Sequence, residues 1–159
     1  MNDKSIQNSI SQLSDTPTLL RELLSAMDPV KMRTKPAPGL FSPLEDAWHL
    51  RDIEREGYLV RIQRMLAEQS PVLQDLDGDQ MAIVRRYNER ELVPALEDFA
   101  CARAESIGLL KGLPPEAWTR SAHFASRTMD LRELIEMMVE HDRGHLSSIR
   151  GVYAASVAA

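Results

Sequence analysis

Two histidines near the C-terminus, His141 and His145, are four residues apart, so on a helix both side chains lie on one face. Ile135 and Met138 precede them at helical spacing and Ile149 follows, which predicts that this face points into a core. An imidazole there needs a hydrogen-bond partner or a metal ion, because an unpaired buried polar group costs roughly 1–3 kcal/mol. The pair is therefore a candidate metal site that still lacks ligands.

A third histidine, His49, follows a strong signal for the start of a helix. Ser42 can accept a hydrogen bond from a backbone amide of the first turn, Pro43 is suited to the first helical position, and Glu45 can bond back to the cap. His49 then lies two turns into the helix, in phase with Ile53. If this helix packs against the last one, the three imidazoles can converge.

The order and separation of these two segments resemble the DinB-like (DinB/YfiT-like) metalloenzyme superfamily. The residues that carry the resemblance are Ser-Pro-Leu-Glu at 42–45, His-Leu-Arg-Asp-Ile-Glu at 49–54 and His-Asp-Arg-Gly-His at 141–145, and it extends over roughly residues 17–150. It implies a four-helix bundle that holds a divalent metal through one histidine of the second helix and two of the fourth. His49, His141 and His145 match those positions.

The resemblance also implies an activity, because characterised relatives include thiol-dependent S-transferases and a thiol-dependent isomerase. A metal at this site would bind a low-molecular-weight thiol as its thiolate and present it to an electrophile. Imidazole suits zinc, nickel, iron and copper, of which we expect zinc or nickel. The alternative is a nonenzymatic bundle in which the metal, or three hydrogen-bonded histidines, staples the helices of a dimerisation or sensing module.

Other polar residues near the motifs have weaker signals. Asp52, Glu56 and Asp142 are close enough along their helices to orient the histidines, but solvated charges or surface ion pairs explain them equally well. His123 falls in a predicted loop and is expected at the surface. Asp142, where a helical metalloprotease motif requires glutamate, argues against a protease.

Composition excludes several classes of protein. With 159 residues, 43% hydrophobic and 27% charged, the chain is expected to form one all-α globular domain. The net charge of -5 and the absence of a basic block argue against nucleic acid as a partner. The lone cysteine, Cys101, excludes an internal disulfide and is expected to be buried. No apolar segment approaches a membrane span, and the expected location is the cytoplasm.

Proline and glycine divide the first half of the predicted bundle. Residues 1–15 are polar and are expected to form at most a weakly docked helix, before a first bundle helix that starts at Thr16. Residues 28–42 contain three prolines after the helix stop and are predicted to cross the bundle end in extended form. A second helix is expected at 43–69, and residues 73–79 read as a connection.

The second half is predicted to supply two more helices. Helix three spans 81–110 with a kink at 90–94, where Pro94 deletes a hydrogen bond; a helix that starts afresh there is the alternative. Residues 116–127 are predicted as a loop, and helix four begins near Thr128 or Asp130 and runs to about Tyr153.

The bundle domain therefore covers 16–153, its connections include long crossovers, and residues 154–159 form a frayed tail. Met137 and Leu146, off the main stripe of helix four, favour a homodimer.

Overall fold

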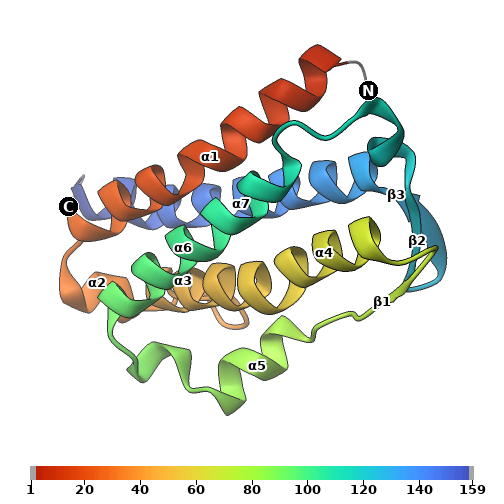
Figure 1. Ribbon diagram of the computed structural model, residues 1–159. Coiled ribbons are helices and arrows are strands. Elements are labelled where there is room, and N and C mark those ends of the chain that lie inside the picture. The colour runs from red at the N-terminus through yellow and green to blue at the C-terminus, as the bar shows by residue number, and fades with distance from the viewer. Residues whose placement is uncertain (1–2, 158–159) are drawn as a thin grey trace.

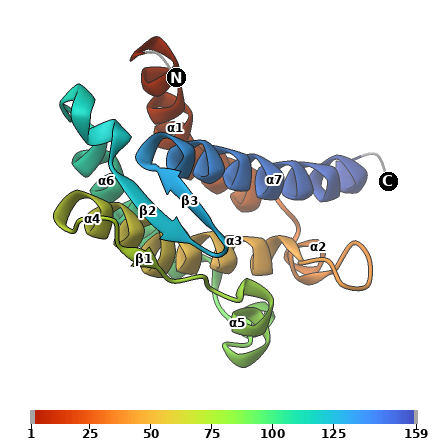
Figure 2. The same ribbon diagram turned by 90° about the vertical axis from the view of Figure 1, so that its right-hand side faces the viewer.

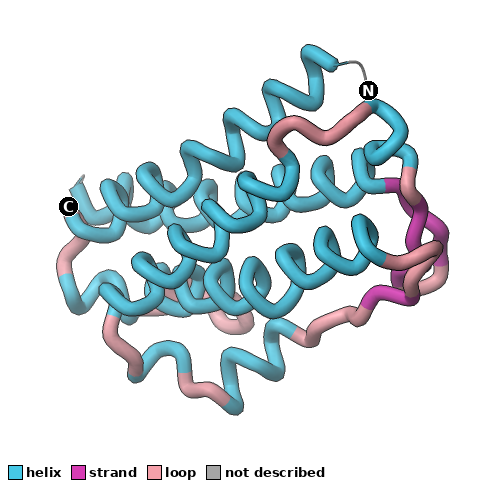
Figure 3. The backbone as a smooth tube through the Cα atoms, in the orientation of Figure 1, coloured by secondary structure: helices cyan, strands magenta, loops and turns pink. Residues whose placement is uncertain are grey.

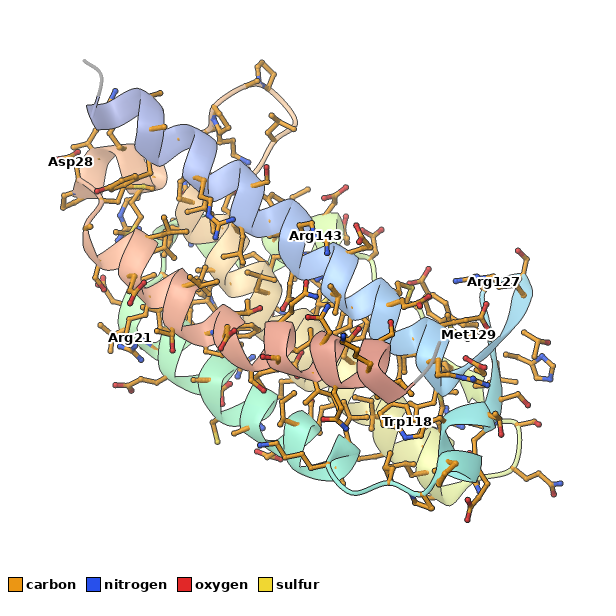
Figure 4. The ribbon with its side chains drawn as sticks, turned by 90° about the horizontal axis from the view of Figure 1, so that it is seen from above. Arg21, Asp28, Trp118, Arg127, Met129 and Arg143 are labelled. Carbon is orange, nitrogen blue, oxygen red and sulfur yellow. The ribbon has the colours of Figure 1, made fainter. Side chains whose placement is uncertain are left out.

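Four long helical segments form a bundle in the computed structural model, which describes residues 3–157. They are α1 (Asp3–Ser25), the run from α3 (Pro43–Asp52) to α4 (Leu59–Ala67), α6 (Leu92–Leu110) and α7 (Leu131–Val157). Both α1 and α3 pack against α6 and α7, so α1 and α3 lie diagonally across the bundle. Figure 1 shows α1 and α7 running in one direction and α3, α4 and α6 in the other. In Figure 4, seen from above, α1 lies between α6 and α7.

Long connections link the four segments, and two of them, from α1 to α3 and from α6 to α7, join helices that lie diagonally across the bundle. Between α1 and α3 the chain forms α2 (Pro29–Arg33), and from α4 to α6 it forms β1 (Val72–Leu73), α5 (Gly78–Val84) and a 3₁₀ turn. Between α6 and α7 it forms another 3₁₀ turn, β2 (Ser121–Phe124) and β3 (Arg127–Asp130). The predicted all-α, four-helix bundle with long crossover connections is confirmed, with α2 as a helical turn inside the segment predicted to be extended.

The first helix contradicts the prediction of a weakly docked segment over residues 1–15. It begins at Asp3, and Ile6, Ile10 and Leu13 are 5%, 5% and 0% exposed. These side chains continue the apolar stripe of the later turns, so the polar residues between them form only the solvent face. Pro17 lies inside the helix and cannot donate to the Leu13 carbonyl four residues earlier. The guanidinium of Arg103 donates to that carbonyl instead, at 3.0 Å.

The second bundle helix covers nearly the predicted range but contains a π-helical segment, Ile53–Tyr58, between α3 and α4. A π turn inserts one residue into the helical repeat and often occurs at functional sites. The segment contains no proline, and its one glycine, Gly57, did not lead us to predict a change in the helix. Its last residue, Tyr58, is 3% exposed and faces the candidate site.

The segment predicted as helix three is two helices. α5 ends at Val84, a 3₁₀ turn follows at Tyr87–Glu89, and α6 starts at Leu92. Pro94 therefore lies in the first turn of α6, where its missing N–H deletes no intrahelical bond. The preferred prediction of a kinked helix is wrong, and the alternative, a fresh start, is what the structure shows.

A three-stranded sheet caps one end of the bundle in place of the predicted loop at 116–127. The strand order is β1-β2-β3, with β1 parallel to β2 and β2 antiparallel to β3. Figure 3 shows the strands together at one end, and Figure 2 views that end directly. The pairing of Val72 with His123 ties the connection before α5 to the connection before α7.

The last helix is longer than predicted. α7 continues past residue 153 to Val157, so the expected fraying does not begin at Ala154; residues 158 and 159 lie outside the described residues. Leu146 is 6% exposed and Met137 is partly buried against the core, so the chain itself covers much of the face that suggested a homodimer. Within residues 3–157 no helix is long and apolar enough to cross a bilayer.

Candidate metal centre

Capping boxes fix the starts of both histidine-bearing helices. At α3 the Ser42 hydroxyl accepts from the Glu45 amide at 3.2 Å, and the Glu45 carboxylate accepts from the Ser42 amide at 2.8 Å. At α7 Asp130 and Glu133 form the same reciprocal pair, each bond 2.9 Å or shorter. Both boxes were predicted from the sequence. They set the phase of each helix, and so the direction of the imidazoles two to four turns later.

The three predicted histidines converge inside the bundle. His49 Nε2 lies 3.0 Å from His141 Nε2, and one ring nitrogen from each of His49, His141 and His145 falls within 4.8 Å of the others. The ring of His145 lies 4.6 Å, centroid to centroid, from each of the other two rings. Among the residues that the structure describes, no other histidine, cysteine or acidic residue joins this group.

Burial keeps two of these imidazoles neutral. It is the main cause that lowers the pKa of His49 from 6.5 to about 3, and the nearby charge of His145 lowers it further. Burial, followed by the charges of His145 and His49, lowers the pKa of His141 to about 2. A neutral imidazole offers a lone pair to a metal, so the protonation state at neutral pH suits a ligand.

One carboxylate orients the cluster, and it was not among the predicted residues. Asp46, 2% exposed, places Oδ1 at 2.6 Å from His145 Nδ1 and so leaves Nε2 of that ring for a ligand. A carboxylate behind a histidine in this way fixes the ring and raises its basicity as a metal ligand. Asp46 precedes His49 by one turn of α3 but contacts a histidine of α7, so spacing along one helix did not indicate it.

Asp52 and Glu56, considered as orienting groups, contact other partners. Asp52 accepts from Arg85 at 2.5 Å, Tyr87 at 2.5 Å and Arg51 at 2.6 Å, and Glu56 pairs with the guanidinium of Arg85 at 2.6 and 2.9 Å. Neither hydrogen-bonds a histidine. The π turn that begins one residue after Asp52 changes the phase of the helix, so spacing counted on an ideal helix could not place Glu56.

Asp142 belongs to a separate charge cluster in the core. Arg103 donates to both oxygens of Asp142, at 2.6 and 3.1 Å, and to Glu54 at 2.9 Å. Ser106 donates to the second oxygen of Glu54 at 2.6 Å. We call Glu54, Arg103, Ser106 and Asp142 the core ion cluster; each member is 3% exposed or less.

An open pocket of about 410 Å³ reaches His141 and His145 from solvent, and His49 lies behind them. Gly39, Leu40 and Phe41 form one wall, and Gly144 and Ser148 of α7 lie on another. The ring of Phe41 lies 5.2 Å from that of His49 and 6.3 Å from that of His145. Asp79 of α5 and Glu140 of α7 also line the pocket. The site therefore has an apolar side and an acidic side, and the imidazoles of His141 and His145 are accessible to a small molecule.

Two other residues lie away from this site. His123 is exposed on β2 with Nδ1 3.1 Å from the Thr128 hydroxyl, which fits the surface position expected for it. Cys101 is exposed on α6, against the prediction that it is buried. Its thiol contacts Glu105 at 3.7 Å, one helical turn along the solvent face.

The bundle and its converging imidazoles define a helical protein with a candidate three-histidine metal centre. The chain belongs to the DinB superfamily, whose family model matches residues 12–149. The resemblance seen in the sequence is thereby confirmed.

A solved structure extends the likeness in fold. YfiT from Bacillus subtilis, described as a probable metal-dependent hydrolase with an unusual four-helix bundle topology, superimposes with a TM-score of 0.92. The match covers 98% of this chain and 90% of that one at 16% identity, which shows a shared fold. No curated protein matches the chain.

Proposed function

We propose that this chain is a metal-dependent enzyme in which His49, His141 and His145 bind one divalent cation, zinc or nickel. The observation that carries the proposal is the convergence of three imidazoles, two of which line an open pocket, with no fourth ligand from the described residues. Structural zinc sites are closed by four protein ligands, whereas catalytic sites keep a position for water or substrate. The donor set therefore fits a catalytic ion.

The surrounding residues support this function in different ways. When bound, such an ion lowers the pKa of a water or thiol and supplies a nucleophile at neutral pH. Asp46 holds His145 through Nδ1, and Phe41 packs near two of the three rings, so the imidazoles are positioned before a ligand arrives. The acidic side chains at the mouth, Asp79 and Glu140, are within the pocket to accept a proton from an entering group.

For the reaction we propose a thiol-dependent transfer. The thiolate sulfur of a small cosubstrate bonds to an electrophilic carbon, and the leaving group departs with the electron pair. The family resemblance supports this chemistry, and the pocket volume of about 410 Å³ is within the range of small-molecule sites. The lone cysteine, Cys101, lies on α6 and does not line the pocket, so the thiol must come from a second molecule.

Hydrolysis is the second candidate. It is favoured by the description of YfiT as a metal-dependent hydrolase and by the carboxylates of Asp79 and Glu140, which can serve as general bases for water. The nonenzymatic alternative, a dimerisation or sensing module, predicts instead that the ion stabilises the fold and that neither thiol nor substrate binds.

The test uses the protein loaded with cobalt, whose absorption reports its ligands. A thiolate-to-cobalt band on addition of cysteine or glutathione, together with thiol-dependent consumption of an aryl halide, is the expected result, and His145→Ala should show neither. Ester hydrolysis without thiol would establish the second candidate and overturn the first. If cobalt raises the melting temperature but gives no thiol band and no turnover, the result would support the nonenzymatic bundle in which the ion only stabilises the fold.

Homodimerisation and a cytoplasmic location stay predictions. Because Leu146 and Met137 are largely covered within the chain, the dimer needs a different surface from the one first considered. A monomeric mass at high protein concentration would refute it.

A further inference from the structure

We propose that Gly78 is a positioning residue of the metal centre: its missing side chain lets the start of α5 pack against His49 and direct the Nε2 edge of that ring toward His141. The inference rests on the proposed metal-binding function and adds a residue to it. Gly78 is distant from all three histidines in the sequence and reaches the site only through the connection between β1 and α5.

The steric evidence is direct. A Cβ at position 78 would lie 2.3 Å from Cε1 and 2.7 Å from Nδ1 of His49, distances that atoms in proteins do not adopt, and 3.6 Å from Nε2. The backbone of Gly78 is outside the left-handed region, so its conformation alone does not require glycine. Close approach to the imidazole is therefore the reason that the position needs a hydrogen.

Neither partner in this contact can move aside easily. The His49 ring is rigid and 9% exposed, and it is held by Phe41 on one side and by the short Nε2 contact to His141 on another. The α5 segment is held by the Asp77 cap, which accepts from the Gln80 amide at 2.9 Å, and by Ala82, 6% exposed in the core. An added methyl must therefore rotate the ring or shift the start of α5 away from it.

This packing also decides which nitrogen of His49 can bind the ion. Nδ1 is buried beneath Gly78 without a hydrogen-bond partner among the described residues, whereas Nε2 points toward His141. A metal at the centre is thus confined to Nε2. Two glycines provide the contrast: a Cβ at Gly108 in α6 or at Gly144 in α7 would meet nothing within 4 Å.

The decisive experiment titrates zinc into chelator-treated wild type, Gly78→Ala and Gly108→Ala, with circular dichroism to check folding. Disturbing the support of a metal ligand typically weakens affinity by about 10- to 100-fold. We expect that loss in Gly78→Ala and wild-type affinity in Gly108→Ala, although alanine raises helix propensity at both positions. A purely structural role would change the melting temperature of the metal-free protein and leave zinc affinity unchanged, and that result would overturn the inference.

A second measurement needs no variant and decides the matter if Gly78→Ala does not fold. In the zinc-loaded wild type, nitrogen NMR of the imidazoles should show His49 coordinated through Nε2 and protonated at Nδ1. Zinc on Nδ1 of His49 would overturn the inference while leaving the metal centre intact. A wild type that binds no zinc would refute the metal centre itself, and the inference with it.

Discussion

Two groups of buried polar residues meet at α7, where Asp142 follows His141, and they differ in how their polar groups are paired within the protein. In the core ion cluster all four carboxylate oxygens of Glu54 and Asp142 have partners. At the histidine site Nδ1 of His49 and Oδ2 of Asp46 have none among the described residues, and a pocket reaches two of the rings. Buried polar groups are normally satisfied. Both carboxylates of the core ion cluster are therefore paired within the protein, although Nε of Arg103 also has no partner among the described residues. The histidine site differs in that a pocket gives a ligand access to His141 and His145.

The largest expected loss of stability comes from Arg103→Met, which removes the cation of the core ion cluster. Methionine roughly preserves the volume but leaves Glu54 and Asp142 buried without a cation, and it frees the Leu13 carbonyl that Pro17 cannot satisfy. Removing one partner of a buried ion pair costs about 3–5 kcal/mol. Urea unfolding should show that loss of stability, and a loss below about 1 kcal/mol would show that the cluster does not hold the bundle together.

The second-largest effect is expected at acid pH, where protonation of the histidine site should lower the stability of the folded protein. Because the pKa values of His49 and His141 are lowered in the folded protein, the unfolded chain binds more protons below its own pKa of about 6.5. Stability is then fully present above that pH and falls as the pH drops. The two rings together should remove roughly 2–4 kcal/mol between pH 7 and 5 in the metal-free protein.

Denaturant titrations at several pH values, with a chelator present, check this slope. The double variant His49→Ala, His141→Ala is the matched control and should be much less sensitive to pH in that range. Equal slopes in the two proteins would mean that the imidazoles are not held neutral by burial.

A smaller effect is expected from Asp46→Asn, which keeps the size of the side chain but removes the charge behind His145. Zinc affinity should fall about 10- to 100-fold, or about 1.4–2.7 kcal/mol, as for other groups that orient metal ligands. Calorimetric titration measures it. Unchanged zinc affinity would show that the contact between Asp46 and His145 does not contribute to metal binding.

The smallest effect should come from Glu56→Gln, the matched control for Asp46→Asn. Glu56 pairs with Arg85 at the surface, where an ion pair contributes up to about 1 kcal/mol. Zinc affinity should equal that of the wild type. A loss similar to that of Asp46→Asn would place Glu56 in the site after all.

Local signals made the bundle and the three histidines predictable. Capping boxes, prolines at helix starts and apolar periodicity act over one or two turns, and the structure follows them at Ser42 and Asp130. Local signals gave a wrong helix boundary where a residue far along the chain stabilises the helix. Pro17 is tolerated inside α1 because Arg103, far along the chain, donates to the carbonyl that the proline leaves free.

The supporting residues of the site were less predictable than its histidines. Asp46 shares a helix with His49 but contacts His145 of α7, so spacing along one helix could not assign it a role. Gly78 could not be found that way, since its role depends on how β1 and α5 fold back over α3. The strands at 121–130 are short, and their pairing with β1 is equally non-local.

The central claim is that one divalent ion binds where the imidazoles of α3 and α7 meet. Metal analysis of purified wild type, His49→Ala, His141→Ala and His145→Ala after equilibration with zinc tests it most directly. The account predicts one tightly held ion per wild-type chain and its loss in every variant, including His49→Ala, whose helix lies across the pocket from the other two histidines. Retention of the ion by His49→Ala at wild-type affinity would contradict it.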